Sequence, residues 1–377
     1  MNSKQFKKEI SRHLNNWRGW RTERKIIVIE SDDWGSICMP SKKVFDSLLA
    51  NGIRVDLCPY ATYDSLANED DFDALFSVLS GVRDSRGRPA VITANTIMTN
   101  PDFQKIEESE FREYGFEVFT ESYQKYRSSF NPLEYYQQGM KAGIFYPQFH
   151  GREHLNIKEW MKQLRDPGSK YRKAFNEGVN WLGSKYNPRS GINLRATYDT
   201  NNSSDLDTQK AELKEGLDLF KEIFKMNSES FIAPNYIIHS DLNGTLKENG
   251  VQFIQGMKYQ VFPKLGANKH EMKRRIQGGM NSSQQINLVR NCEFEPSQYS
   301  QTYDSVGECM KGINNAFLWK KPAIISAHRL NFIGNIHPEN RTRNLKKFKE
   351  LLSRATKKWP DIEFMTSVEL GKLMSDR

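Results

Sequence analysis

The sequence predicts an α/β protein built on a parallel sheet. Short apolar runs rich in β-branched residues alternate with amphipathic segments along the chain, and three of the apolar runs end in residues that can titrate or bind a metal. Alternating strand and helix signals are typical of βα units, which form parallel sheets. Functional side chains collect at the carboxyl ends of such strands.

Seven runs have the length and composition of buried strands, and five segments between them have helical periodicity. The strands are expected at 25–29, 90–94, 144–148, 230–233, 252–255, 323–326 and 362–365, and the helices at 42–50, 70–79, 207–225, 304–319 and 339–357. Residues 258–300 are polar, basic and turn-rich, which predicts an inserted loop or hairpin. Residues 1–24 are expected to form a basic N-terminal arm that docks on a single domain, 25–377.

Two adjacent aspartates, Asp32 and Asp33, follow the first apolar run and precede Gly35. Two carboxylates at one strand end can divide the work of catalysis, since one can bind a cation while the other abstracts a proton. A solvated turn is the competing interpretation of these residues taken alone.

A histidine pair, His150 and His154, follows the aromatic run at 144–149 and precedes a segment that predicts a helix. Side chains four positions apart share one face of a helix at about 5–6 Å, a spacing that suits two imidazoles on one metal ion. Together with Asp33 they would form a triad with open coordination positions, as in catalytic sites. Two exposed histidines that cap a helix are the alternative.

A late apolar run ends in His328, and the second predicted strand ends in Asn95. Because His328 has no histidine four residues away, we expect it to donate a proton rather than to bind a metal. A buried structural histidine is the alternative for this residue alone. Asn95 is expected to face the same site.

The order of these motifs resembles that of the polysaccharide deacetylase family, carbohydrate esterase family 4. The matching motifs are Asp-Asp-x-Gly at 32–35, His-x-x-x-His at 150–154, a proline-containing strand end at 230–236 and the strand that ends in His328. They span about residues 25–370. The resemblance implies a distorted (β/α)7 barrel and a metal-dependent enzyme that removes acetyl groups from N- or O-acetylated sugars.

Carried over by motif, the resemblance assigns a role to each candidate residue. Asp32 matches the general base and His328 the general acid, while Asp33, His150 and His154 match the metal ligands. Zinc is the default metal for such a nitrogen-rich set of ligands.

The segment around Asn235 and Tyr236 falls where the family has a groove wall and a backbone N–H that stabilises an oxyanion. Trp34 lies beside the aspartate pair and is a candidate for stacking on a sugar ring. The expected substrate is therefore an acetylated carbohydrate.

Two departures from the family pattern leave a second interpretation open. Ile232 stands where the family has an arginine that orients the base, and the fourth family motif, a tryptophan and aspartate pair, has no match. Arg195 is the candidate replacement for that arginine. The alternative is a carbohydrate-binding protein on the same scaffold whose catalysis has lapsed. A phosphoesterase is less favoured, because the triad contains few carboxylates.

Composition argues against two other classes of protein. The net charge is +9, but the basic residues are spread among acidic ones and no nucleic-acid-binding motif is present. No run approaches the eighteen or so apolar residues of a membrane span, in line with a mean hydropathy of −0.71.

The basic N-terminus lacks the apolar core of a signal peptide, which predicts a cytoplasmic protein. The four cysteines lack metal-binding spacing and are expected to be free thiols, and the sequence leaves the oligomeric state open.

Overall fold

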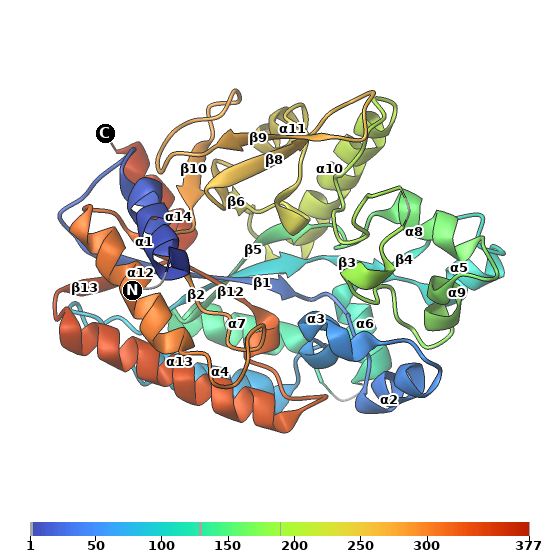
Figure 1. Cartoon of the computed structure of the whole chain (residues 1–377), viewed down its shortest axis with the longest axis horizontal. Helices are drawn as coiled ribbons and strands as arrows, with labels where there is room; N and C mark the ends of the chain where they lie inside the picture. The colour runs from blue at the N-terminus through green and yellow to red at the C-terminus, as the bar shows by residue number, and fades with distance from the viewer. Residues whose placement is uncertain (1–2, 128–129, 189, 377) are drawn as a thin grey trace.

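A parallel sheet that curves into a ring forms the centre of the protein (Figure 1). The computed structural model describes residues 3–127, 130–188 and 190–376. Five strands follow one another in the sheet in chain order: β1 (Lys25–Trp34), β2 (Ile92–Ile97), β5 (Phe145–Gly151), β6 (Ser230–Phe231) and β7 (Phe253–Gly256). On the other edge of β1 lies β12 (Ala323–His328), also parallel.

One extended segment closes the ring. Its first part, β10 (Ile286–Val289), pairs with β7, and its second part, β11 (Cys292–Glu293), pairs with β12, both in parallel. Only Arg290 and Asn291 separate the two parts. Counted in the described residues, the ring therefore has seven strand positions, and the fold is the distorted (β/α)7 barrel expected above.

The seventh position of the barrel is not the strand that the sequence predicts. The run at 362–365 does form β13 (Ile362–Met365), but this strand pairs with the start of β1, ahead of β2 on the same edge. The barrel position is occupied by β10 and β11, which lie inside the range expected as an insertion. The rest of that range includes β8 (Tyr259–Pro263) and β9 (His270–Arg274), an antiparallel hairpin.

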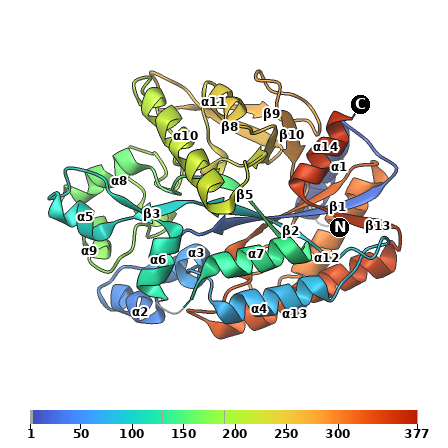
Figure 2. The same cartoon turned by 180° about the vertical axis from the view of Figure 1, so that it is seen from behind.

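The five predicted helices are present within two residues of their expected ends. They are α2 (Lys42–Ala50), α4 (Glu69–Ser80), α10 (Asp205–Phe224), α12 (Ser305–Leu318) and α13 (Pro338–Lys358). The structure adds α1 (Ser3–Asn16), α3 (Pro59–Tyr63), α5 (Phe103–Glu108), α6 (Phe119–Tyr126), α7 (Pro132–Ala142), α8 (Ile157–Leu164), α9 (Lys170–Phe175), α11 (Leu242–Glu248) and α14 (Ser367–Ser375), and a short hairpin of β3 (Thr99–Pro101) and β4 (Phe116–Val118). Helices α4, α7 and α13 cover one side of the barrel and α10 and α11 the opposite side (Figure 2).

Burial of apolar side chains between the barrel and its helices holds these elements together. In β1 every residue from Ile26 to Trp34 is buried, as expected for a strand covered on both faces. The indole of Trp34 packs against Phe72 of α4 and Phe145 of β5, with ring centroids 5.4 and 4.7 Å apart. All four cysteines are free thiols, as predicted. No helix in the described ranges has the length and apolar content that crossing a bilayer requires.

Candidate metal centre and active site

A break in the strand geometry brings the two aspartates to one cavity. Successive side chains of a regular strand point to opposite faces, so Asp32 and Asp33 could not share a site on an unbroken β1. Asp33 has φ = 73° and Gly35 has φ = 81°, and the register between β1 and β2 shifts between Ser31 and Trp34. The chain thus turns at the strand end, and both carboxylates line the same cavity.

Asp33, His150 and His154 form a buried cluster whose ligand atoms all lie within 4.8 Å of one another. The distances from Asp33 Oδ1 to the Nε2 atoms of His150 and His154 are 3.4 and 3.2 Å. The two histidines do not share a helix, contrary to the expectation from their spacing. His150 lies in β5 and His154 in the bend before α8, with Gly151 at φ = 129° between them.

The free atoms of this cluster fit a tetrahedral cation such as zinc. Two ligands about 2.0–2.1 Å from one tetrahedral ion lie about 3.3 Å apart, close to the two distances above. His150 Nδ1 lies 2.9 Å from the Ile232 carbonyl, so it donates its proton there and leaves Nε2 free. Asp33 Oδ1 is buried with no hydrogen-bond partner among the described residues. Burial and the Arg195 charge lower the pKa of His154 to about 4, which keeps its imidazole neutral, as metal binding requires.

Arg195 contacts Asp33 rather than Asp32, the predicted base. Its Nη2 lies 3.3 Å from Asp33 Oδ2, the oxygen opposite the one that faces the histidines. Burial raises the pKa of Asp33, but His154 and Arg195 outweigh that effect, and the net pKa lies well below its ordinary value. The prediction that Arg195 replaces the family's base-orienting arginine is therefore wrong.

Arg290, at the junction of β10 and β11, binds the carboxylate of Asp32. Its Nη1 and Nη2 each donate to one oxygen of Asp32 at 2.7 Å, and its Nε donates to Glu30 at 2.6 Å. Asn95 also donates to Asp32 Oδ1, at 2.7 Å. Burial raises the pKa of Asp32, yet the Arg290 charge and hydrogen bonds outweigh it, so the pKa falls below its ordinary value. Asp32 is thus an oriented carboxylate at neutral pH.

His328, at the end of β12, lies beside Asp32. Its Nε2 is 3.7 Å from Asp32 Oδ2, and its Nδ1 lies 2.5 Å from Glu295 Oε1. Burial lowers the pKa of His328, but the charge of Glu295 and the hydrogen bond to it prevail and raise the pKa to about 9. The imidazolium form, which can donate a proton, is therefore the stable form at neutral pH.

These groups open into a cavity of about 510 Å³, a volume typical of small-molecule sites. Asn235 and Tyr236 line it, each with a positive φ, 55° and 60°. Two other predicted substrate contacts do not fit the structure. Trp34 is 1% exposed and packs in the core, with its Nε1 bonded to Ser31, because the turn at Asp33 directs it away from the cavity. Asn95 is fully buried and donates a hydrogen bond to Asp32 instead of facing the cavity.

Two residues of the site, Arg290 and Glu295, were not found from the sequence. Both lie in the polar range 258–300, which gave no strand signal apart from the short apolar run at 286–289. A buried strand followed by Arg290 could have been inferred from that run, but the partner of Arg290 could not, because Asp32 lies 258 residues away.

Comparisons with known proteins show a likeness in fold. No protein-family model and no curated protein matches the chain. A candidate glycoside hydrolase/deacetylase of Parabacteroides distasonis has a TM-score of 0.49 and 10% identity, over 94% of this chain and 72% of that one. A candidate polysaccharide deacetylase of Mycobacterium smegmatis has a TM-score of 0.43 and 8% identity, over 95% and 93%.

The 4-alpha-glucanotransferase of Thermococcus litoralis has a TM-score of 0.45 and 8% identity, and this chain spans only 40% of its length. Several of the similar structures are polysaccharide deacetylases, the family that the sequence motifs resemble. At these identities and TM-scores, any function must be argued from the site itself.

Proposed function

We propose that the protein is a metal-dependent hydrolase that removes acetyl groups from a carbohydrate. The observation that supports this most is the position of Asp32: Arg290 orients it, and it lies directly beside the Asp33, His150 and His154 cluster in one cavity. A carboxylate base next to a cation site with open positions is the arrangement that hydrolysis of an acyl group requires.

Asp33, His150 and His154 would hold the cation, with zinc as the default. When bound, zinc supplies Lewis acidity and lowers the pKa of water toward neutrality. Asp32 accepts the proton of the attacking water, because Arg290 keeps its carboxylate ionised and in place. His328, protonated through Glu295, donates a proton to the departing amine or alkoxide.

Backbone amides beside the cavity would bind the oxyanion. The Tyr236 N–H donates to the Ala233 carbonyl at 2.9 Å within its own turn, so we assign the oxyanion contact to the N–H of Asn235. The rings of Tyr60, Trp181 and Tyr236 line the same cavity and offer apolar faces for a sugar.

Acetate release tests the proposal. The full chain, loaded with zinc and with its metal content measured, is incubated with N- and O-acetylated sugars of several classes. We expect acetate from at least one class, and we expect Asp32→Asn to abolish its release while the bound metal is retained. A metal-loaded protein that releases no acetate from any of them would contradict the proposal.

The alternative of a lapsed carbohydrate-binding protein loses much of its support. Its two motives were Ile232 in place of the arginine that orients the base and the missing fourth family motif. Arg290 makes that contact from the junction of β10 and β11, so Asp32 has an arginine partner.

A further inference from the structure

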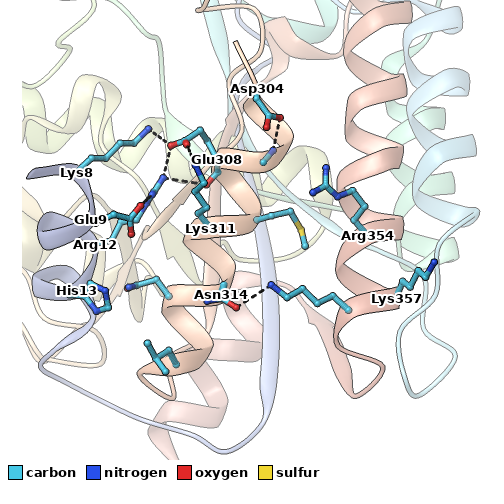
Figure 3. A pocket seen from close by; sticks show the side chains of 15 residues that line it. Lys8, Glu9, Arg12, His13, Asp304, Glu308, Lys311, Asn314, Arg354 and Lys357 are labelled. Carbon is cyan, nitrogen blue, oxygen red and sulfur yellow. Dashed lines mark hydrogen bonds and ion pairs between the residues drawn. The ribbon is translucent and has the colours of Figure 1, made fainter. Parts of the chain in front are cut away.

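The N-terminal helix α1 is attached to the barrel by its polar side. Arg12 Nη2 donates to Glu308 of α12 at 2.7 Å, and Lys8 Nζ donates to the same carboxylate at 2.6 Å. Asn16 is 3% exposed and donates to Asn315 of α12 at 2.8 Å. Figure 3 shows the side chains of Lys8 and Arg12 directed from α1 toward Glu308.

The apolar side chains of α1 face outward as one stripe. Phe6, Ile10 and Leu14 follow one another at spacings of four residues, which places them on one face of α1, and Trp17 directly follows the end of the helix. They are 55, 42, 43 and 50% exposed. A surface helix of a globular protein normally buries its apolar stripe and exposes its polar face. Helix α1 does the opposite, since its polar face contacts α12 and its apolar stripe is exposed. A continuous exposed stripe, unlike scattered apolar residues, marks an interaction surface.

The surroundings of the stripe are basic. Residues 1–24 contain seven Lys or Arg and two Glu, a net +5 that is more than half of the +9 of the whole chain. Lys7 and Arg18 are exposed. The β8–β9 hairpin adjoins the end of the helix, because Arg274 donates to the Leu14 carbonyl, and the hairpin adds a further apolar side chain, Met272, which is 63% exposed.

We propose that α1 binds in the plane of an anionic lipid membrane surface, with this stripe at the boundary between headgroups and acyl chains. An exposed apolar stripe that includes Trp and Phe, within a basic segment, is the pattern of interfacial helices, and anionic headgroups complement the charge of residues 1–24. A second copy of the chain is a poorer occupant, because pairing two stripes would bring two segments of charge +5 together. The inference does not depend on the proposed hydrolase function.

Vesicle sedimentation of the full chain tests the proposal. Wild type is mixed with vesicles of phosphatidylcholine alone or with about a third of phosphatidylglycerol. We expect binding to the anionic vesicles only, weakened by added salt. Ile10→Gln/Leu14→Gln removes apolar area from the stripe and should lower the affinity at least tenfold. Leu57→Gln is the matched control, since Leu57 is 54% exposed and lies outside residues 1–24, and it should bind as wild type does.

A second variant tests the contribution of the basic residues, and a second assay tests whether another copy of the chain covers the stripe. Lys7→Gln/Arg18→Gln should reduce both the affinity and its salt dependence, and circular dichroism with thermal unfolding should show that all variants are folded. The proposal is overturned if wild type ignores anionic vesicles, or if Ile10→Gln/Leu14→Gln binds them equally well. It is also overturned if wild type forms a dimer that this double variant abolishes and vesicles do not compete with.

Discussion

Replacing Arg290 by methionine should destabilise the protein strongly, because the substitution keeps most of the volume and removes the charge. Arg290, Asp32 and Glu30 are 1, 2 and 0% exposed and are joined by three short hydrogen bonds. Loss of one partner of a buried ion pair leaves uncompensated charge and typically costs about 3–5 kcal/mol. This is a large part of the roughly 5–15 kcal/mol by which domains are stable.

The loss of stability in Arg290→Met should depend on pH. In wild type the pKa of Asp32 is lowered, so its contribution is present above about pH 4 and is lost only as the pH falls through the folded-state pKa. In wild type, burial already raises the pKa of Glu30 although Arg290 opposes it, and without Arg290 burial should raise the pKa of Asp32 as well. The folded state then binds more protons than the unfolded state up to the raised pKa, so stability falls as the pH rises through that window. The deficit of Arg290→Met should therefore be smaller near pH 5 than near pH 7.5.

Urea unfolding followed by circular dichroism, at both pH values, measures this deficit. Arg275→Met is the control for loss of an arginine, because Arg275 is partly buried and its Nη1 donates to the Gln255 carbonyl at 2.8 Å rather than to a carboxylate. Its removal should cost less and depend less on pH. A deficit for Arg290→Met below about 1 kcal/mol, or one equal at the two pH values, would refute the assignment of Arg290 as the counter-ion of a buried carboxylate pair.

Three further predictions concern the metal centre and its acid and base. Asp33→Asn and His154→Ala should each lower zinc affinity by more than the roughly 10–100-fold typical of outer-shell changes, measured by competition with a chelator, and unchanged affinity would exclude these ligands. Asp32→Asn should keep that affinity and lower acetate release by at least about 10²-fold; unchanged turnover would rule out its role as base. Glu295→Gln should bring the pKa of His328, measured by NMR, down from about 9. Since this pKa is raised, the stability it provides is complete below about pH 6.5 and is lost as the pH rises through 9. Glu295→Gln should make that loss smaller, because Asp32 and Asp33 still raise the pKa.

Local patterns sufficed to predict most of the barrel strands and the five long helices, whereas the barrel itself was implied by the family resemblance. Apolar β-branched runs gave six of the barrel strands, and the five amphipathic segments gave helices, because both signals depend on residues close together in the chain. The seventh barrel position was missed, since β10 is only four residues long and β11 two. The run at 362–365 gave a correct strand in a different place, because pairing with the start of β1 is a long-range choice that no local pattern records.

The acidic pair, the two histidines and His328 could be recognised from the sequence because each follows an apolar run. Their geometry could not. The spacing of His150 and His154 suggested a helix, whereas a strand end and a bend bring them together. Trp34 was placed in the cavity from its neighbourhood in sequence, but the positive φ of Asp33 reverses its direction.

Arg290 joins two roles in a single side chain. It sits where the chain crosses from the β7 edge to the β12 edge, and it also carries the positive charge that two interior acids need. Before the barrel closes, Arg290 does not contact Asp32 or Glu30. The carboxylate of Asp32 is then not oriented, and burial of the two acids is energetically unfavourable. The protein should therefore become active only when the barrel is complete. A partly folded molecule should be inactive, because Asp32 is not yet positioned as a base.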